Sequence, residues 1–272
     1  MHWELPAEEG SPPREWLNFP TALLYGYQVY TTFRWPIEAR WLHRHMERLE
    51  SDARAIGLDW RCDRENLTRQ LEACFQQEMP VMRLTVVADA DAYGDFFKAP
   101  SPSGRLLLST RTLPAGRELL RLKSIRYQRP LPTIKLGAMA PLILTRRKAM
   151  AGGFDDVLLV SPQGHLCEAS TANIFFIREG GLYTPDPERD GCLPGITRLQ
   201  VLEAAETLGI PIQTKSPISV WALRRMDGAF LTNAVQGIEP VRCVDQIAFP
   251  WSDSAMELLK KLVTALSLRD KP

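Results

Sequence analysis

The chain has 272 residues, of which 45% are hydrophobic and 24% are charged, the composition of an ordinary globular protein. Its 33 basic and 32 acidic side chains leave a net charge of +1, so the charge balance does not favour a nucleic acid or an anionic membrane as a partner. No apolar run approaches the roughly 20 residues that cross a bilayer, segment 1–13 lacks the apolar core of a secretory signal, and no C-x-x-C pair occurs. We therefore expect a cytoplasmic protein without a metal site or a disulfide framework.

Three segments of the first half are rich in apolar, β-branched or aromatic residues and predict strands: 23–35, 81–89 and 104–111. Apolar residues recur every three or four positions over 39–58, which predicts an amphipathic helix. A second helix is expected over 66–76, with Asn66 as its N-cap. The turn-rich segment 112–116 is the best candidate for a linker between domains.

The second half mixes helices with closely spaced strands. Predicted helices cover 140–153, 196–209 and 254–266. Predicted strands cover 155–161, 165–177, 182–185 and the first part of 228–241, which continues into a turn. This pattern predicts a mixed α/β (α+β) fold, with a smaller N-terminal α/β domain over 1–111 and a larger C-terminal domain over 117–272.

Glu168 is the one carboxylate in the segment His165–Phe176, "HLCEASTANIFF". Taken as a single strand, this segment has no solvent face, so we expect it to be buried. A buried carboxylate needs a cationic or hydrogen-donating partner. The partner is either the protonated ring nitrogen of a flat ligand or a nearby arginine, and the arginine candidates are Arg126, Arg129, Arg146 and Arg147.

Lys135 is the only charged residue between Arg129 and Arg146 and is surrounded by apolar neighbours. One interpretation is a lysine whose stem lies along apolar surface while its amine reaches water. The other is a desolvated amine with a lowered pKa, which is able to form a Schiff base.

Two further segments could bind phosphate. "LPGITR", Leu193–Arg198, places a glycine and a threonine at the start of a predicted helix, where backbone N–H groups and the helix dipole attract anions. "LTNAVQG", Leu231–Gly237, ends a predicted strand with small polar residues. Each segment also has a plain structural interpretation: a loop-to-helix junction for the first, the more common role of a glycine before a helix, and an Asn turn for the second.

The order and spacing of four groups of segments resemble the class IV aminotransferase family, the pyridoxal-phosphate enzymes of fold type IV. These groups are "HMERL", "IKLGAMAPLILTRRKA", "DDVLLVSPQGHLCEASTANIFFI" with "YTP", and "LPGITR" with "LTNAVQGIEPV". The resemblance covers about residues 24–260 and implies a two-domain fold of the D-amino-acid aminotransferase type. It also implies pyridoxal 5'-phosphate as cofactor, a small-molecule substrate, and a homodimer whose active sites lie near the subunit interface.

The resemblance implies roles for individual residues. Lys135 matches the lysine that binds the cofactor covalently and later moves a proton. Glu168 matches the carboxylate at the pyridine nitrogen, and Arg48 matches an arginine on the phosphate. The remaining cofactor-binding residues that it implies are Ile196, Thr197, Asn233 and Ala234.

The segment "YTTFR" resembles the "FTT" segment of the 4-amino-4-deoxychorismate lyases within this family. The leading interpretation is therefore a lyase that releases pyruvate and 4-aminobenzoate for folate biosynthesis. In such a lyase Lys135 removes a proton, and Thr32 positions the substrate or relays a proton. The candidate substrate-binding residues are Tyr30, Arg34, Arg83, Lys98 and Arg126.

Two other functions are kept as alternatives. The first is a class IV aminotransferase acting on branched-chain or D-amino acids. The second is a non-catalytic phosphate-binding or interaction protein with the same fold. One departure from the family pattern concerns the cofactor ring: "LGAMA" after Lys135 has no polar side chain where the family usually places a Tyr or Asn near the ring hydroxyl.

Overall fold

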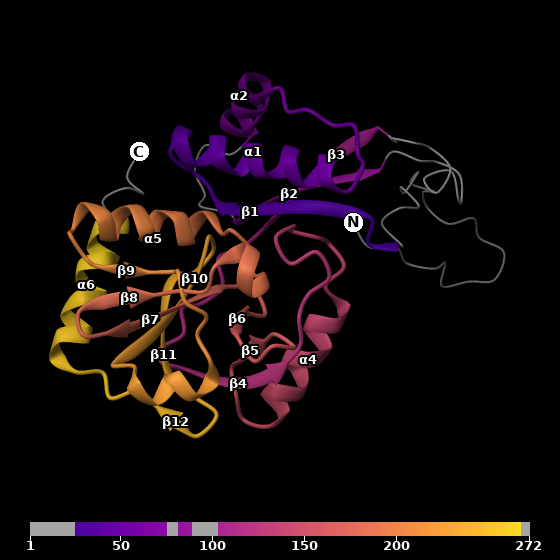
Figure 1. Cartoon of the computed structure of the whole chain (residues 1–272). Helices are drawn as coiled ribbons and strands as arrows, with labels where there is room; N and C mark the ends of the chain where they lie inside the picture. The colour runs from indigo at the N-terminus through magenta and orange to yellow at the C-terminus, as the bar shows by residue number, and fades with distance from the viewer. Residues whose placement is uncertain (1–24, 75–80, 89–102, 268–272) are drawn as a thin grey trace, which may run out of the picture.

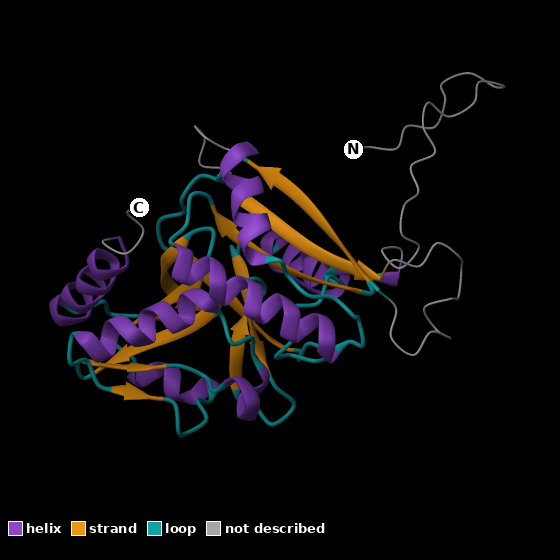
Figure 2. Cartoon of the chain, turned by 90° about the horizontal axis from the view of Figure 1, so that it is seen from above, coloured by secondary structure: helices purple, strands orange, loops and turns teal. Residues whose placement is uncertain are grey.

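The computed structural model describes residues 25–74, 81–88 and 103–267. The chain forms one sheet of three strands and one of nine, with helices packed against each (Figures 1 and 2). This arrangement confirms the mixed α/β fold predicted from the sequence. The small sheet comes from residues before 112–116 and the large sheet from residues after it, so we propose this segment as the domain boundary. Within the described ranges, no helix has both the length and the apolar character that crossing a membrane requires.

The small sheet is antiparallel, in the order β1-β2-β3. Its strands are β1 (Gln28–Arg34), β2 (Val81–Ala88) and β3 (Gly104–Arg111), and its helices are α1 (Ala39–Ala55) and α2 (Arg64–Cys74). The predicted apolar face of α1 packs on this sheet, because Leu42, Met46 and Leu49 are buried in one cluster with Phe33 and Met82. Leu42, Met46 and Leu49 follow helical spacing and therefore lie on one face of α1. Phe33 and Met82 are paired across β1 and β2 and lie on the sheet face that meets this helix.

Helix α2 begins before the predicted helix. Its first residue is Arg64, and Oδ1 of Asp63 accepts a hydrogen bond from the backbone N–H of Asn66 at 3.1 Å. The predicted N-cap at Asn66 is therefore wrong, because Asp63 caps the helix and Asn66 lies in its first turn. Asp and Asn are equally good N-cap residues, so the local sequence does not choose between them.

The large sheet is mixed, in the order β6-β5-β4-β11-β10-β7-β8-β9, and β12 pairs with β11. Its strands are β4 (Leu120–Arg126), β5 (Asp156–Val160), β6 (Leu166–Ala169), β7 (Asn173–Arg178), β8 (Gly181–Tyr183), β9 (Ile212–Gln213), β10 (Gly228–Asn233), β11 (Gly237–Val244) and β12 (Ile247–Ala248). Strand β4 runs parallel to β5 and β11, whereas β10 runs antiparallel to β7 and β11.

The helices of the second half are α4 (Ala140–Ala151), α5 (Ile196–Thr207) and α6 (Asp253–Ser267), with short turns of helix at η2 (Pro187–Gly191) and η3 (Val220–Arg225). Helices α5 and α6 cover one part of the large sheet, where Phe175 and Phe230 stack at 5.1 Å and pack with Val201 and Leu262. Helix α4 lies on the other side of the molecule, beside β4 and β5 (Figure 1). The three helices predicted for this half are confirmed.

The segment His165–Phe176 is not one strand, which corrects the expectation above. Strand β6 ends at Ala169 and β7 starts at Asn173, and a hydrogen bond of 2.8 Å from the N–H of Ala169 to the carbonyl of Ala172 closes the turn between them. Strand β6 pairs with β5, whereas β7 pairs with β8 and β10. Glu168 is buried as predicted, with 5% of its surface exposed.

The chain between β4 and α4 returns to the small sheet. The backbone N–H of Tyr30 donates to the carbonyl of Lys135 at 3.1 Å, and the N–H of Gly137 donates to the carbonyl of Gln28 at 2.9 Å. A Cβ atom on Gly137 would lie 2.3 Å from Cγ of Gln28, so this close approach favours glycine. Lys135 is therefore held where the two sheets meet.

Candidate active site

A cavity of about 730 Å³ lies between the small sheet and the facing end of the large sheet. Residues of both sheets line it, together with the segment between β4 and α4. Most of the predicted site residues are among them: Tyr30, Thr32, Arg48, Arg83, Lys135, Ile196, Thr197, Asn233 and Ala234. Residues that are far apart in the sequence therefore share one site.

Arg34 does not line this cavity. Its Nε donates to the carbonyl of Val235 at 2.5 Å, and the residue lines a smaller neighbouring cavity of about 230 Å³. By strand alternation Arg34 lies on the same face of β1 as Tyr30 and Thr32, but it is the last residue of the strand, two positions beyond Thr32. The predicted role of Arg34 in substrate binding is therefore not supported by its position.

Of the other two candidate cations, Arg126 falls within the described residues. Arg126 is exposed at the end of β4 and is not part of the cavity lining. The sequence could not show this, because the position of β4 within the large sheet depends on long-range pairing. Lys98 lies outside the described residues.

Lys135 lines the cavity and is partly buried. Its Nζ lies 4.7 Å from the centroid of the Tyr30 ring. The pKa of Lys135 is lowered, mainly by burial and also by Arg48 and Arg129, against the opposing influence of Tyr30 and Glu168. A lysine with a lowered pKa has a larger fraction of neutral amine, the form that attacks a carbonyl carbon. The structure therefore favours the desolvated amine over the lysine that reaches into water.

Tyr30 lies against both Lys135 and Arg83. Cζ of Arg83 is 3.7 Å from the ring centroid, and the hydroxyl is 3.7 Å from Sδ of Met139. Burial acts to raise the pKa of Tyr30, but the positive charges of Lys135, Arg83 and Arg129 bring it below its ordinary value. Tyr30 thus supplies a phenol near the amine, at a site where the segment after Lys135 has no polar side chain.

Helix α1 contributes His45 and Arg48 to the cavity. Oγ1 of Thr31 accepts a hydrogen bond from Nη2 of Arg48 at 2.8 Å and lies 2.6 Å from Nδ1 of His45. Burial lowers the pKa of His45 well below 6.5, and Arg48 and Lys135 lower it further, so the ring is neutral and its Nδ1 can accept a hydrogen bond from the Thr31 hydroxyl. Thr31 therefore holds the Arg48 guanidinium at the cavity wall.

Glu168 has an arginine partner. Nε of Arg129 donates to its Oε1 at 2.7 Å, and the backbone N–H of Leu193 donates to its Oε2 at 3.0 Å. The same guanidinium donates to the carbonyls of Pro132 at 2.5 Å and Ile134 at 3.2 Å. Of the candidate arginines, the structure selects Arg129. Glu168 is not part of the cavity lining, but a carboxylate offers about four acceptor sites, so these two bonds leave it able to accept a further hydrogen bond.

The first turn of α5 forms one end of the cavity. Gly195 precedes the helix without a side-chain cap, and Gly195, Ile196 and Thr197 line the cavity. Uncapped N–H groups and the helix dipole favour an anion at this place. A Cβ atom on Gly195 would lie 2.1 Å from Oδ1 of Asn173, whose Nδ2 donates to the carbonyl of Leu193 at 2.8 Å. The close packing of Asn173 therefore requires glycine here.

The turn between β10 and β11 forms a second wall. Oδ1 of Asn233 accepts hydrogen bonds from the backbone N–H groups of Val235 at 2.9 Å and Gln236 at 2.8 Å, so this side chain builds an Asn turn. The preceding residue, Thr232, also lines the cavity and is 1% exposed. Its Oγ1 has no hydrogen-bond partner among the described residues. Sequence reasoning missed Thr232, because a threonine inside a strand carries no local signal of function.

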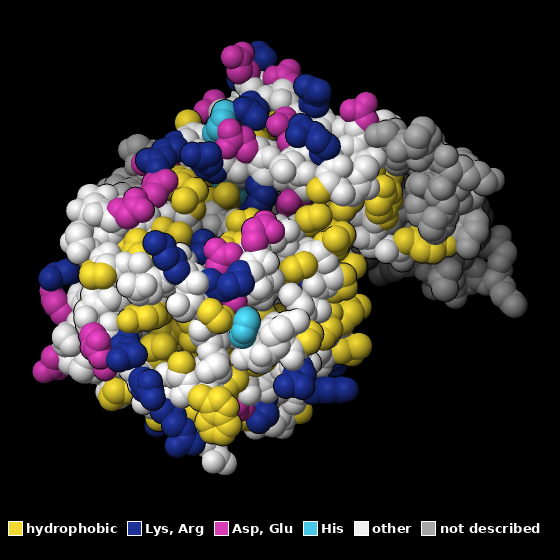
Figure 3. Space-filling model, in the orientation of Figure 1, with side chains coloured by type: hydrophobic (Ala, Val, Ile, Leu, Met, Phe, Trp, Pro, Cys, Tyr) yellow, Lys and Arg dark blue, Asp and Glu magenta, His cyan; other side chains and the backbone are white. Residues whose placement is uncertain are grey.

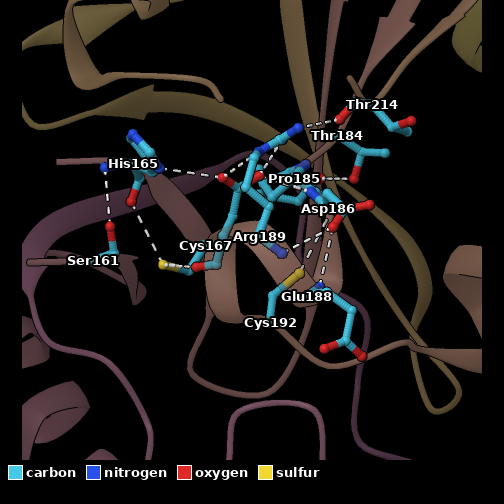
Figure 4. A network of polar contacts seen from close by, with 12 residues as sticks. Ser161, His165, Cys167, Thr184, Pro185, Asp186, Glu188, Arg189, Cys192 and Thr214 are labelled. Atoms are coloured by element: carbon cyan, nitrogen blue, oxygen red, sulfur yellow. Dashed lines mark hydrogen bonds and ion pairs between the residues drawn. The ribbon is translucent and has the colours of Figure 1, made fainter. Parts of the chain in front are cut away.

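A polar network fixes the loop that leads into α5 (Figure 4). The fully buried Asp190 carboxylate accepts from Nη2 of Arg189 at 2.5 Å and from the backbone N–H of Asp186 at 2.8 Å, and it lies 3.3 Å from Nδ1 of His165. Burial raises the pKa of Cys167 to about 12, so its thiol stays protonated and donates to the carbonyl of Asp190 at 3.0 Å. The network joins this loop to the residues around β6, the strand of Glu168.

The cavity lining is strongly cationic. No Asp or Glu is among the described residues that line it. The lining contains Lys135 and five arginines: Arg48, Arg83, Arg111, Arg117 and Arg146. Arg117 pairs with Glu239 and Arg146 with Asp156, both behind the lining. A cavity with this lining suits a ligand that carries several negative charges.

Arg83 and Arg111 are neighbours on the small sheet. The register pairs Arg83 with Ser109 and Val81 with Arg111, so the two arginines are diagonal neighbours on one face. Burial lowers the pKa of Arg83, as does the adjacent charge of Arg111, while Tyr30 acts in the opposite direction. Within the described part of the chain, neither guanidinium forms an ion pair with a carboxylate. Sequence reasoning missed Arg111, because this contact depends on the β2–β3 register.

The residues at the cavity fit a ligand with a phosphate group and an aldehyde. Arg48 and the start of α5 provide an anion site, and Lys135 provides an amine with a lowered pKa. Two buried polar atoms of the lining residues, Nε of Arg48 and Oγ1 of Thr232, have no hydrogen-bond partner within the described residues. Buried polar atoms are normally satisfied, so these two are available to a ligand.

The known proteins that are similar to this chain include the following three. An assigned branched-chain-amino-acid aminotransferase of Thermotoga maritima is 30% identical over 225 residues, 81% of this chain and 78% of that protein. A structure from Legionella pneumophila, assigned as a 4-amino-4-deoxychorismate lyase, is 25% identical with a TM-score of 0.82, and the match covers 96% of this chain and 97% of that one. The branched-chain aminotransferase of Thermoproteus uzoniensis, in a structure with norvaline, has a TM-score of 0.81 at 23% identity, over 93% of this chain and 89% of that one.

The sequence profile described as amino-transferase class IV matches residues 28–244, a range that includes every described residue lining the cavity. Class IV aminotransferases use pyridoxal 5'-phosphate, and the amine, the arginine and the helix start at the cavity fit this cofactor. The match covers most of the chain and agrees with the fold and with the cavity residues. This protein belongs to the class IV aminotransferase family.

Proposed function

We propose that this protein is a cytoplasmic, pyridoxal-phosphate-dependent 4-amino-4-deoxychorismate lyase that releases pyruvate and 4-aminobenzoate for folate biosynthesis. The observation that carries the proposal is the cationic cavity wall of Arg83 and Arg111, which lies near Lys135 and has no acidic residue in its described lining. The substrate of this lyase carries two carboxylates. The similarity to the Legionella pneumophila structure over nearly the whole of both chains supports the same conclusion.

Arg48 and the N–H groups at the start of α5 would hold the cofactor phosphate, and Lys135 would hold its aldehyde carbon. Glu168 would hold a proton on the ring nitrogen, and Arg129 keeps this carboxylate in place. When bound, the cofactor supplies an electron-withdrawing ring that stabilises negative charge on the carbon next to the substrate amino group.

In the proposed reaction, Nζ of Lys135 takes the proton from C4 of the substrate, the carbon that carries the amino group. The electron pair left at C4 forms a ring double bond as the C3–O bond breaks. The departing enolate takes up one proton and becomes pyruvate, and the ring that remains is aromatic 4-aminobenzoate. Lys135 suits this role because its lowered pKa gives it a neutral amine that can accept the proton.

Thr32 is proposed to position the leaving group. It lines the cavity and stands directly opposite Arg83 in the β1–β2 register. Its hydroxyl can donate to the oxygen on which charge develops as the C3–O bond breaks. Arg83 and Arg111 would bind the carboxylates of the substrate on the same wall.

A class IV aminotransferase acting on branched-chain or D-amino acids is the second candidate. The observation in its favour is the 30% identity to the Thermotoga maritima protein over most of both chains. The two functions differ in their need for an amino acceptor. In a first assay the purified protein is supplied with 4-amino-4-deoxychorismate and no keto acid: the lyase forms pyruvate and 4-aminobenzoate, whereas an aminotransferase leaves this substrate unchanged. In a second assay, with an amino acid and 2-oxoglutarate, the aminotransferase moves amino groups between the two.

We also propose that the protein is a homodimer. Helix α4 exposes Ile143, Leu144 and Met150, at 52%, 57% and 54% of their surfaces, and hydrophobic side chains gather on the side of the molecule where α4 lies (Figure 3). Ile143 also lines the cavity, so a second subunit on α4 would narrow its mouth. Light scattering after gel filtration tests this proposal: we expect twice the mass of one chain, and the mass of a single chain would contradict it.

A further inference from the structure

Asp52 is a buried acid at the cofactor lysine, and nothing in the sequence pattern drew attention to it. Only 5% of its surface is exposed. Its Oδ2 accepts a hydrogen bond of 3.1 Å from the backbone N–H of Lys135. Asp52 lies in the last turn of α1, so a residue of the small domain holds the main chain of a residue from the large one.

This is an unfavourable place for a carboxylate. The last turn of a helix carries the negative end of the helix dipole, and burial removes the charge from water. Burial raises the pKa of Asp52, and the hydrogen bond from Lys135 and the charges of Arg48, Lys135 and Arg129 act against this rise. Burial therefore works against the charged form of Asp52, while the neighbouring cations of the site work in its favour.

The backbone of Lys135 is held by hydrogen bonds on both sides of its Cα atom. Its N–H is bound by Asp52, and its carbonyl accepts from the N–H of Tyr30 at 3.1 Å. Both partners belong to the small sheet and its helix. Because the two bonds hold the peptide units on either side of the Lys135 Cα atom, they set the direction in which the Lys135 side chain leaves the backbone. This geometry makes Asp52 part of the positioning of the amine.

We propose that Asp52 positions Lys135 through its backbone N–H and, by its charge, favours the protonated form of the Lys135 amine. Capture of the cofactor joins the Lys135 nitrogen to the aldehyde carbon and releases one water, and it requires the neutral amine. Asp52 therefore raises the pH at which capture becomes fast, while its hydrogen bond raises the rate of capture once the amine is neutral. This inference concerns cofactor capture and is independent of which substrate the enzyme uses.

The groups facing Lys135 come from several elements. They are Tyr30 from β1, His45, Arg48 and Asp52 from α1, Arg129 from the segment after β4, and Glu168 from β6. Of the two acids, Glu168 is bound directly to Arg129, whereas Asp52 is bound to the Lys135 peptide itself. Substitution of Asp52 therefore changes the charge at the amine without releasing Arg129.

The test is the rate at which the full-length apoprotein captures added pyridoxal 5'-phosphate, followed by absorbance over a range of pH. Each profile gives a midpoint, which reports the charge state of Lys135, and a plateau at high pH, which reports its positioning. The variants are Asp52→Asn, which keeps an acceptor oxygen without the charge, and Asp52→Ala, which loses both. The matched control is Glu47→Gln, at an acid on the same helix whose side chain is 40% exposed.

For Asp52→Asn we expect a midpoint at lower pH than in the wild type and a plateau that is at least as high. For Asp52→Ala we expect the same direction of midpoint shift and a plateau lowered about tenfold, the equivalent of one hydrogen bond to a charged group. Glu47→Gln should match the wild type. An Asp52→Asn profile that superimposes on the wild type, or an Asp52→Ala plateau equal to it, would overturn the inference. A lower melting temperature without a shift of the midpoint would assign Asp52 a purely structural role and also overturn it.

Discussion

Nε of Arg129 donates a hydrogen bond of 2.7 Å to Oε1 of Glu168, and the same guanidinium holds the carbonyls of Pro132 and Ile134 just before Lys135. The pair is almost fully enclosed, with 12% of the Arg129 side chain and 6% of the Glu168 side chain exposed. Arg129 therefore connects the carboxylate proposed for the cofactor ring with the peptide segment that carries the cofactor lysine.

Glu168→Gln should lower both the stability of the apoprotein and its ability to hold the cofactor. The glutamine amide faces two donors, Arg129 Nε and the Leu193 N–H, and its own NH₂ group can satisfy neither of them. Breaking a buried ion pair in this way costs about 3–5 kcal/mol in the free energy of unfolding. Urea unfolding measures this, with the exposed Glu188→Gln as control; an unchanged free energy of unfolding would show that the Arg129 contact is unimportant.

Arg83→Gln and Arg111→Gln should weaken substrate binding. Each loses a guanidinium that would bind a substrate carboxylate, so KM should rise about tenfold or more, the equivalent of one charge-assisted hydrogen bond, with a smaller change in kcat. Steady-state kinetics of pyruvate release measures both constants. Arg126→Gln, at the exposed arginine outside the cavity, is the matched control and should match the wild type. If all three variants had the wild-type KM, the substrate would bind elsewhere.

The neutral state of His45 predicts a pH dependence of stability. Its pKa in the folded protein is lowered well below 6.5, so between these two values the unfolded chain binds one more proton than the folded one. The stability contributed by the neutral ring is present above the unfolded pKa and is lost as the pH falls. The expected slope from this residue approaches about 1.4 kcal/mol per pH unit.

Urea unfolding of the apoprotein at pH 7 and pH 5 measures this effect. In His45→Asn the fall in the free energy of unfolding between these two pH values should be smaller than in the wild type, because the titrating ring is absent. His43→Asn, at an exposed histidine of the same helix, should keep the wild-type dependence. Equal falls in His45→Asn and the wild type would mean that His45 does not stay neutral.

Asp190→Asn should weaken cofactor binding although Asp190 does not line the cavity. The carboxylate accepts from Arg189 and from the Asp186 N–H inside the loop that leads to α5, and an amide satisfies fewer of these donors. The loop should become less ordered, and the Kd of pyridoxal 5'-phosphate, measured by fluorescence titration, should rise. Glu188→Gln in the same turn is the control, since its side chain is exposed. A wild-type Kd in Asp190→Asn would show that the network around Asp190 does not affect cofactor binding.

Sequence reasoning located those site residues that have a local signature. Gly195 and Thr197 stand at the start of a helix whose position follows from apolar spacing and glycine, and Lys135 is an isolated charge among apolar residues. The structure brings Lys135 and Thr197 to one cavity. The assignment of roles to them still rests on the resemblance and on the proposed function.

The remaining features depend on contacts between distant parts of the chain. Asp52 meets Lys135 across the junction of the two sheets, and Arg111 joins Arg83 through the β2–β3 register. The break after Ala169 was missed because small residues are compatible with both a strand and a turn. Sequence alone also could not choose which arginine meets Glu168, because Arg129 and Glu168 are 39 positions apart in the chain.

The central claim is tested most directly by incubating the purified protein and its Lys135→Ala variant with 4-amino-4-deoxychorismate and pyridoxal 5'-phosphate, without a keto acid. We predict that the wild type releases pyruvate and 4-aminobenzoate in equal amounts and that Lys135→Ala releases neither, because it lacks the amine that takes the C4 proton. The claim is contradicted if the wild type forms neither product and, in a parallel assay with 2-oxoglutarate, transfers amino groups to it from a branched-chain or D-amino acid.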